Sequence, residues 1–145
     1  MKLNWKLLFL LSLVGIPLGV VQLFNAWGGP FIELGVVLAL SEACAVIVVK
    51  KTARLYFLSG FMLALMTGLW QNIIYVAFFS TESANHALYI QSLADWGPDA
   101  RVSIFLYGVV TDVVQGIVLG VLFFITGKVM KSSGVHHAEA FETTE

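Results

Sequence analysis

Hydrophobic residues form four long runs along the chain, and short polar stretches separate them. The runs cover about residues 7–24, 31–49, 55–79 and 102–129. A helix that crosses a bilayer needs roughly 20 mostly apolar residues. The pattern therefore predicts an all-α fold, namely a polytopic membrane protein in which four transmembrane helices form an antiparallel bundle within residues 1–130.

The polar stretches predict the loops and the tail. Residues 80–101 form the longest of the connecting stretches and are expected to be the outer loop. Within it, residues 85–93 have helical composition and mixed polarity, so a short helix on the membrane surface and a plain connection are both open. Residues 131–145 are polar and are predicted to form a disordered cytoplasmic tail.

Lysine and arginine residues are distributed very unevenly between the two predicted sides of the membrane. Arg101 stands alone on one side. The other side carries Lys2, Lys6, Lys50, Lys51, Arg54, Lys128 and Lys131. Because basic residues are enriched in short cytoplasmic loops, both termini are predicted to be cytoplasmic.

The composition narrows the class of protein further. Of the 145 residues, 59% are hydrophobic and 12% are charged, whereas a typical soluble domain has about 45–50% apolar and about 25% charged residues. A soluble enzyme, a secreted disulfide scaffold and a disordered chain are therefore not expected. The formal net charge of −1 provides no basic field for nucleic acid. Cys44 is the single cysteine and the three histidines lie outside the apolar runs, so we expect no cofactor and no metal site.

Small residues recur at intervals of three and four on each predicted helix, which keeps them on one helix face. The second helix carries Gly35, Ala39 and Ala43. The glycines expected to pack the other helices together are Gly15, Gly19, Gly60, Gly68, Gly116 and Gly120. Burial from water does not drive helices together in lipid, but close packing of small residues does. We therefore expect these faces to point into the bundle.

Two carboxylates interrupt the apolar runs. Glu42 lies near the middle of the second predicted helix and Asp112 near the middle of the fourth. A carboxylate at the centre of a transmembrane helix costs about 2.5–3.5 kcal/mol on insertion scales. Together with nearby amides, they suggest a polar column that serves as an ion or proton path, formed by Glu42, Asp112, Gln115, Gln71, Asn72 and Gln22. The alternative is that these groups only form hydrogen bonds between helices, for about 0.6 kcal/mol each.

No catalytic constellation is present in the sequence: it contains no nucleophile motif, no phosphate-binding glycine loop and no zinc-binding helix motif. The first functional hypothesis is a non-enzymatic structural or accessory subunit, embedded in the bilayer as a homo-oligomer or within a larger membrane complex. The alternative is a small proton- or cation-coupled carrier or channel that uses Glu42 and Asp112. A third hypothesis is a lipid-modifying enzyme that uses His86 at the outer surface.

Three short stretches resemble small four-helix bacterial membrane proteins of unknown function. They are Leu3-Asn4-Trp5-Lys6-Leu7, Tyr56-Phe57-Leu58-Ser59-Gly60-Phe61, and Gly116-Ile117-Val118-Leu119-Gly120 followed by Lys128. The resemblance extends over nearly the whole chain. It implies a multi-pass protein of the bacterial inner (cytoplasmic) membrane, and it assigns no functional residue.

Overall fold

The computed structural model describes residues 3–24, 30–51, 55–85, 91 and 99–132, and this part of the chain is helical, without strands. The helices are α1 (Trp5–Ser12), α2 (Gly15–Leu23), α3 (Pro30–Lys51), α4 (Tyr56–Ala77), α5 (Phe79–Asn85) and α7 (Ala100–Ser132). Three helical stretches are long and apolar enough to cross a membrane: Trp5–Leu23, Tyr56–Ala77 and Ala100–Ser132. The structure thereby confirms the all-helical class and the presence of membrane-spanning helices.

The first predicted helix is divided in two. Residues 7–24 were expected to form one helix in which Pro17 could produce a kink, but α1 ends at Ser12 and α2 begins at Gly15. The cause is Pro17, which has no N–H to donate to the carbonyl of Leu13 and whose ring would clash with it. At the break, the N–H of Ile16 donates to that carbonyl at 3.1 Å, in the tighter pattern that spans three residues.

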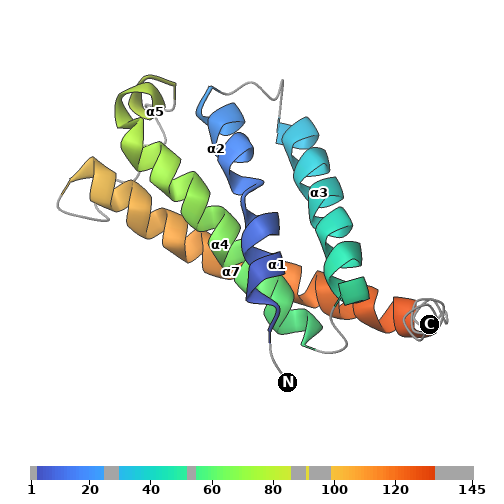
Figure 1. The fold of residues 1–145 in the computed structure, drawn as a ribbon. Helices are drawn as coiled ribbons and strands as arrows, with labels where there is room; N and C mark the ends of the chain where they lie inside the picture. The colour runs from blue at the N-terminus through green and yellow to red at the C-terminus, as the bar shows by residue number, and fades with distance from the viewer. Residues whose placement is uncertain (1–2, 25–29, 52–54, 86–90, 92–98, 133–145) are drawn as a thin grey trace.

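Helices α4 and α7 form the central pair, and they lie side by side along most of the length of α4 (Figure 1). Glycines allow this close approach. A Cβ added at Gly60 would lie 2.6 Å from the carbonyl oxygen of Leu119, and one at Gly120 would lie 2.8 Å from the ring of Phe57. Gly116 similarly contacts the ring of Phe61.

Helix α2 packs on α4 through glycines of its own. A Cβ at Gly15 would lie 2.4 Å from the carbonyl oxygen of Thr67, and one at Gly19 would lie 3.2 Å from the Cα of Gln71. Gly15 is the first residue after the break between α1 and α2. The break therefore coincides with a close approach of α2 to the backbone of α4.

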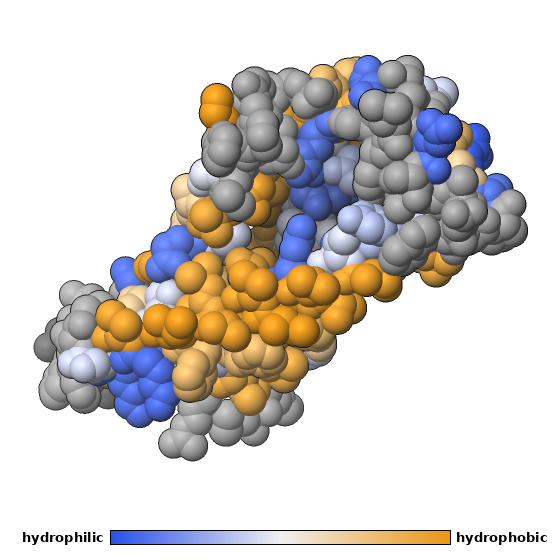
Figure 2. All heavy atoms as spheres, turned by 180° about the vertical axis from the view of Figure 1, so that it is seen from behind, coloured by the Kyte–Doolittle hydropathy of each residue, from blue (hydrophilic) through white to orange (hydrophobic). Residues whose placement is uncertain are grey.

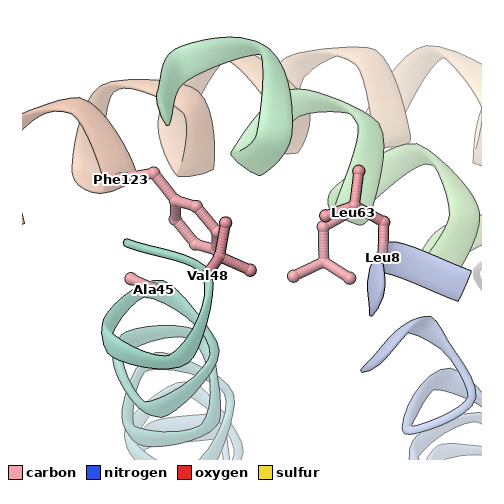
Figure 3. Packing of buried hydrophobic residues seen from close by; sticks show 5 residues of the cluster. All are labelled: Leu8, Ala45, Val48, Leu63 and Phe123. Carbon is pink, nitrogen blue, oxygen red and sulfur yellow. The ribbon is translucent and has the colours of Figure 1, made fainter. Parts of the chain in front are cut away.

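All four long helical segments meet in one apolar cluster (Figure 3). It consists of Leu8 from α1, Ala45 and Val48 from α3, Leu63 from α4 and Phe123 from α7. Phe123 is the largest of the fully buried side chains and points toward the α3 residues. This cluster lies toward the end of the molecule where α1 begins and α3 ends.

Among the side chains of α3 that the structure describes, the buried ones all lie in its C-terminal half. Its buried side chains are Ala45, Val48 and Val49, whereas Ile32 and Leu38 nearer its N-terminus are exposed. Figure 1 shows this N-terminal half standing apart from α2 and α4. Helix α3 is therefore attached to the rest of the molecule mainly at one end.

The predicted outer loop begins with a helix. Helix α5 (Phe79–Asn85) occupies residues that were expected to be part of this loop, and the side chain of Asn85 donates to the carbonyl of Leu23 at 2.8 Å. This bond ties α5 to the last turn of α2. Most of the segment 85–93 considered for a surface helix lies outside the described residues, as does His86.

Helix α7 is longer than the predicted 102–129. It begins at Ala100 because Asp99 caps it, accepting a hydrogen bond from the backbone N–H of Val102 at 2.9 Å. It ends at Ser132, so the first two residues of the predicted tail are helical. Residues 133–145 of that tail lie outside the described part of the chain.

Candidate functional site

Asp112 and Asn72 form a hydrogen-bonded pair between α7 and α4. The Nδ2 of Asn72 donates to the Oδ2 of Asp112 at 2.8 Å, and the two residues are 3% and 8% exposed. No described basic side chain forms an ion pair with Asp112. A buried carboxyl group is stabilised here by an amide donor, which is one way in which helices in lipid satisfy a polar group.

Each member of the pair occupies a space that a glycine on the facing helix leaves open. A Cβ added at Gly68 of α4 would lie 1.9 Å from the Oδ1 of Asp112. One added at Gly108 of α7 would lie 1.9 Å from the Oδ1 of Asn72. In each helix the glycine and the polar residue are four positions apart, so the contact is reciprocal. The spacing in the sequence also predicted Gly108 to share one small-residue face of this helix with Asp112, Gly116 and Gly120.

A small cavity lies between α2, α3, α4 and α7, and neither Asn72 nor Asp112 lines it. Its volume is about 60 Å³, which is enough for ordered water. Polar and thiol side chains line it together with apolar ones: Ser41, Cys44, Thr67, Gln71 and Gln115. Figure 2 shows a face of the molecule on which hydrophilic side chains lie in a hollow beside an extended hydrophobic surface.

The structure thus brings Gln71 and Gln115 together at one cavity, as members of the predicted polar column. Thr67 and Ser41 line the same cavity but were not predicted from the sequence. Thr67 precedes Gln71 by four residues, which places both on one face of α4, and this spacing was the signal available. The hydroxyl of Ser41 donates to the carbonyl of Val37 at 2.7 Å, within its own helix.

Gln22 is not among the residues that line this cavity, and it lies one turn after Leu18 on α2. Its Oε1 accepts a hydrogen bond from the hydroxyl of Tyr75. A second bond of this kind joins the Nε1 of Trp70 to the Oγ of Ser12 at 3.2 Å. Both bonds join the first apolar stretch to α4. They agree with the alternative in which the polar groups within the membrane only form hydrogen bonds between helices.

Glu42 does not lie beside Asp112. Its side chain is exposed on α3, and its Oε1 accepts a hydrogen bond from the hydroxyl of Thr126 at 3.3 Å. Thr126 is about four turns from Asp112, or about 21 Å along α7. The two carboxylates therefore lie in different environments, one between α4 and α7 and the other on an open helix face.

Among the described residues, no group of three histidine, cysteine, aspartate or glutamate side chains is arranged to hold a metal ion. Several described polar side chains pair across helices, among them Asn72 with Asp112 and Trp70 with Ser12. The carboxyl group of Asp112 can take up or release a proton, but it does not line the cavity that holds Gln71 and Gln115. Comparison with protein-family models, with curated proteins and with solved structures finds no match to this chain.

The Asn72–Asp112 bond is expected to be measurable as a coupling energy. We expect Asn72→Ala and Asp112→Ala to lower the free energy of unfolding by amounts whose sum exceeds the loss in the double variant. The difference should be about 0.6–1.7 kcal/mol, as for other hydrogen bonds between membrane helices. Reversible unfolding in mixed micelles measures all three variants. Ser12→Ala combined with Asp112→Ala serves as a control and should be additive. If the losses of Asn72→Ala and Asp112→Ala were also strictly additive, a specific bond between the two side chains would be contradicted.

Proposed function

We propose that this chain is a non-enzymatic, multi-pass membrane protein that serves as a structural or accessory subunit. In this proposal α3 is a fourth transmembrane helix, because its 22 residues extend about 33 Å and the hydrocarbon core of a bilayer is about 30 Å thick. The bacterial inner membrane is the location implied by the resemblance in sequence.

The same end of the molecule carries the described lysines, which supports a cytoplasmic location of both termini. Lys6 lies at the start of α1, Lys50 and Lys51 at the end of α3, and Lys128 and Lys131 at the end of α7. Arg101 lies at the opposite end of α7. Basic residues are concentrated on the cytoplasmic side of membrane proteins.

The open face of α3 is the observation that carries the accessory role. Its small residues Gly35, Ala39 and Ala43 are exposed, and nothing lies within 4 Å of a Cβ added at Gly35. The described glycines of α2, α4 and α7 all contact a neighbouring helix instead. Small residues on a helix face allow close approach of a second helix, and here no described helix uses that face.

Glu42 adds a reason for a partner at this face. It is exposed beside Ala43, and Thr126 is its one hydrogen-bond partner among the described residues. An acidic side chain within a transmembrane helix is expensive in contact with lipid. A partner helix that shields Glu42 and offers it a donor would lower that cost, so the face is suited to a neighbouring subunit or a second copy of the chain.

Site-specific photo-cross-linking tests this proposal in the membranes of cells that produce the protein. We expect a cross-linking side chain at position 39 to give a product of discrete mass, because Ala39 lies on the open face of α3. The same side chain at Val118, which is 60% exposed on α7, should give little product. Gly35→Leu should reduce the yield at position 39 without lowering the stability of the protein in detergent.

Equal yields of cross-linked product at positions 39 and 118, or no discrete product at either, would overturn the accessory role.

The second candidate is a proton- or cation-coupled carrier or channel, and it is favoured by the location of Gln71 and Gln115 at the cavity. Ion flux into vesicles that is lost when Glu42→Gln and Asp112→Asn are combined would establish that role instead. Ion flux that is the same for the unaltered protein and the double variant, or absent from both, would exclude the carrier or channel.

A further inference from the structure

A second pocket lies where α4 begins and α7 ends. Its volume is about 360 Å³, and it is lined by Leu55, Tyr56, Phe57, Phe124, Gly127, Lys128 and Lys131. It is separate from the cavity lined by Gln71 and Gln115, with which it shares no lining residue. The absence of a side chain at Gly127 makes room for the ring of Tyr56, which a Cβ would meet at 2.3 Å.

The walls of this pocket combine aromatic rings with two cations. Lys128 and Lys131 are three residues apart on α7, so they lie on one side of the helix. The Nζ of Lys128 is 5.5 Å from the centre of the Phe124 ring, within the range of a cation–π contact. Among the described residues, no acidic side chain lines the pocket, and neither lysine forms an ion pair.

The position of the pocket in the fold favours a negatively charged ligand. The first turn of α4 faces it, and the start of a helix carries a partial positive charge. No described side chain caps that turn. Lys50 and Lys51 at the end of α3 add positive charge at the same end of the molecule.

We propose that this pocket binds an anionic phospholipid. The phosphate group lies between Lys128 and Lys131, and the first part of the acyl chains lies along Phe57 and Phe124. A free phosphate ion would use the lysines alone, whereas a lipid also uses the aromatic walls. The pocket lies at the ends of two apolar helices that are long enough to cross a bilayer, where lipid headgroups are located. Basic pockets between transmembrane helices are suited to such headgroups.

Native mass spectrometry of the full chain in detergent, titrated with phosphatidylglycerol, tests the proposal. We expect Lys128→Gln combined with Lys131→Gln to weaken the first binding event about 30-fold, which corresponds to roughly 1 kcal/mol for each lysine. Lys50→Gln combined with Lys51→Gln is the matched control. It removes two exposed lysines from the same end of the molecule but not from the pocket, and it should weaken binding far less.

Two further titrations distinguish a lipid from other phosphate sources. Phosphatidylcholine, which has no net charge, should bind weakly and with no difference between the two double variants. Glycerol phosphate should bind with much lower affinity than phosphatidylglycerol because it cannot use the aromatic walls. Equal losses in both lysine pairs would mean general attraction to the charged end and would overturn the site. Equal binding of glycerol phosphate would overturn the lipid as its ligand.

Discussion

Gly68→Leu is expected to destabilise the protein by about 3 kcal/mol, which is the upper end for inserting side-chain volume into a packed interface. The first added atom would lie 1.9 Å from the Oδ1 and 2.1 Å from the Cγ of Asp112. Asp112 cannot move aside without breaking its hydrogen bond to Asn72. The helices α4 and α7 would therefore have to separate along their glycine-lined interface.

Gly35→Leu is the matched control for this substitution. It introduces the same side chain into another helix, at a position where a Cβ meets nothing within 4 Å. We expect its unfolding free energy in mixed micelles to change by less than about 0.5 kcal/mol. Equal losses in the two variants would mean that the larger side chain acts in the same way at any position, and that α4 and α7 do not approach as closely as described.

Phe123→Ala is expected to have the second largest effect, a loss of about 2–3 kcal/mol. Its ring is 0% exposed and joins residues from α1, α3 and α4 in the apolar cluster. Large-to-small substitutions in soluble cores cost about 3–5 kcal/mol for phenylalanine. The transfer from water contributes little in a membrane, so the lost packing contacts account for the lower figure.

Phe124→Ala provides the comparison for this prediction. Phe124 is the next residue of α7, but it is 47% exposed. We expect its removal to cost less than about 1 kcal/mol, because few packing contacts are lost. Chemical or thermal unfolding of both variants in the same detergent decides the matter. Similar losses for the two alanine variants would mean that α7 is rotated relative to the orientation described.

These experiments separate the packing of the molecule from its proposed associations. Gly68 and Phe123 report on contacts that hold α4, α7 and the C-terminal half of α3 together. Gly35 reports on the open face of α3, and Lys128 reports on the pocket at the end of α7. A variant that loses association or lipid binding while retaining its unfolding free energy would therefore identify a surface with a function of its own.

The all-helical class and the presence of membrane-spanning segments were predictable from the sequence. An apolar run of about 20 residues in a bilayer must satisfy its backbone polar groups internally, which a helix does. This constraint is local, so hydropathy alone was sufficient. The break near Pro17 also has a local cause, although its position at residues 13–14 depends on how α2 meets α4 at Gly15.

The arrangement of the polar residues could not be predicted in the same way. Spacing placed Asp112 and Asn72 on faces rich in small residues, but not opposite Gly68 and Gly108, because the register between two helices is set by the fit of all their side chains. For the same reason, Glu42 and Asp112 have similar positions within their own helices but lie in different surroundings. Glu42 is on an exposed face of α3, and Asp112 is buried between α4 and α7.

The sequence by itself determined that this protein is built from apolar helices suited to a membrane, because helix formation and membrane insertion depend on residues close together in the chain. Only the tertiary structure decided which faces are used. Phe123 and Phe124 are adjacent and chemically identical, yet one is buried and the other exposed. The small-residue faces of α4 and α7 meet, whereas that of α3 stays open. Those differences arise from contacts between segments far apart in the chain, which periodicity within one helix does not specify.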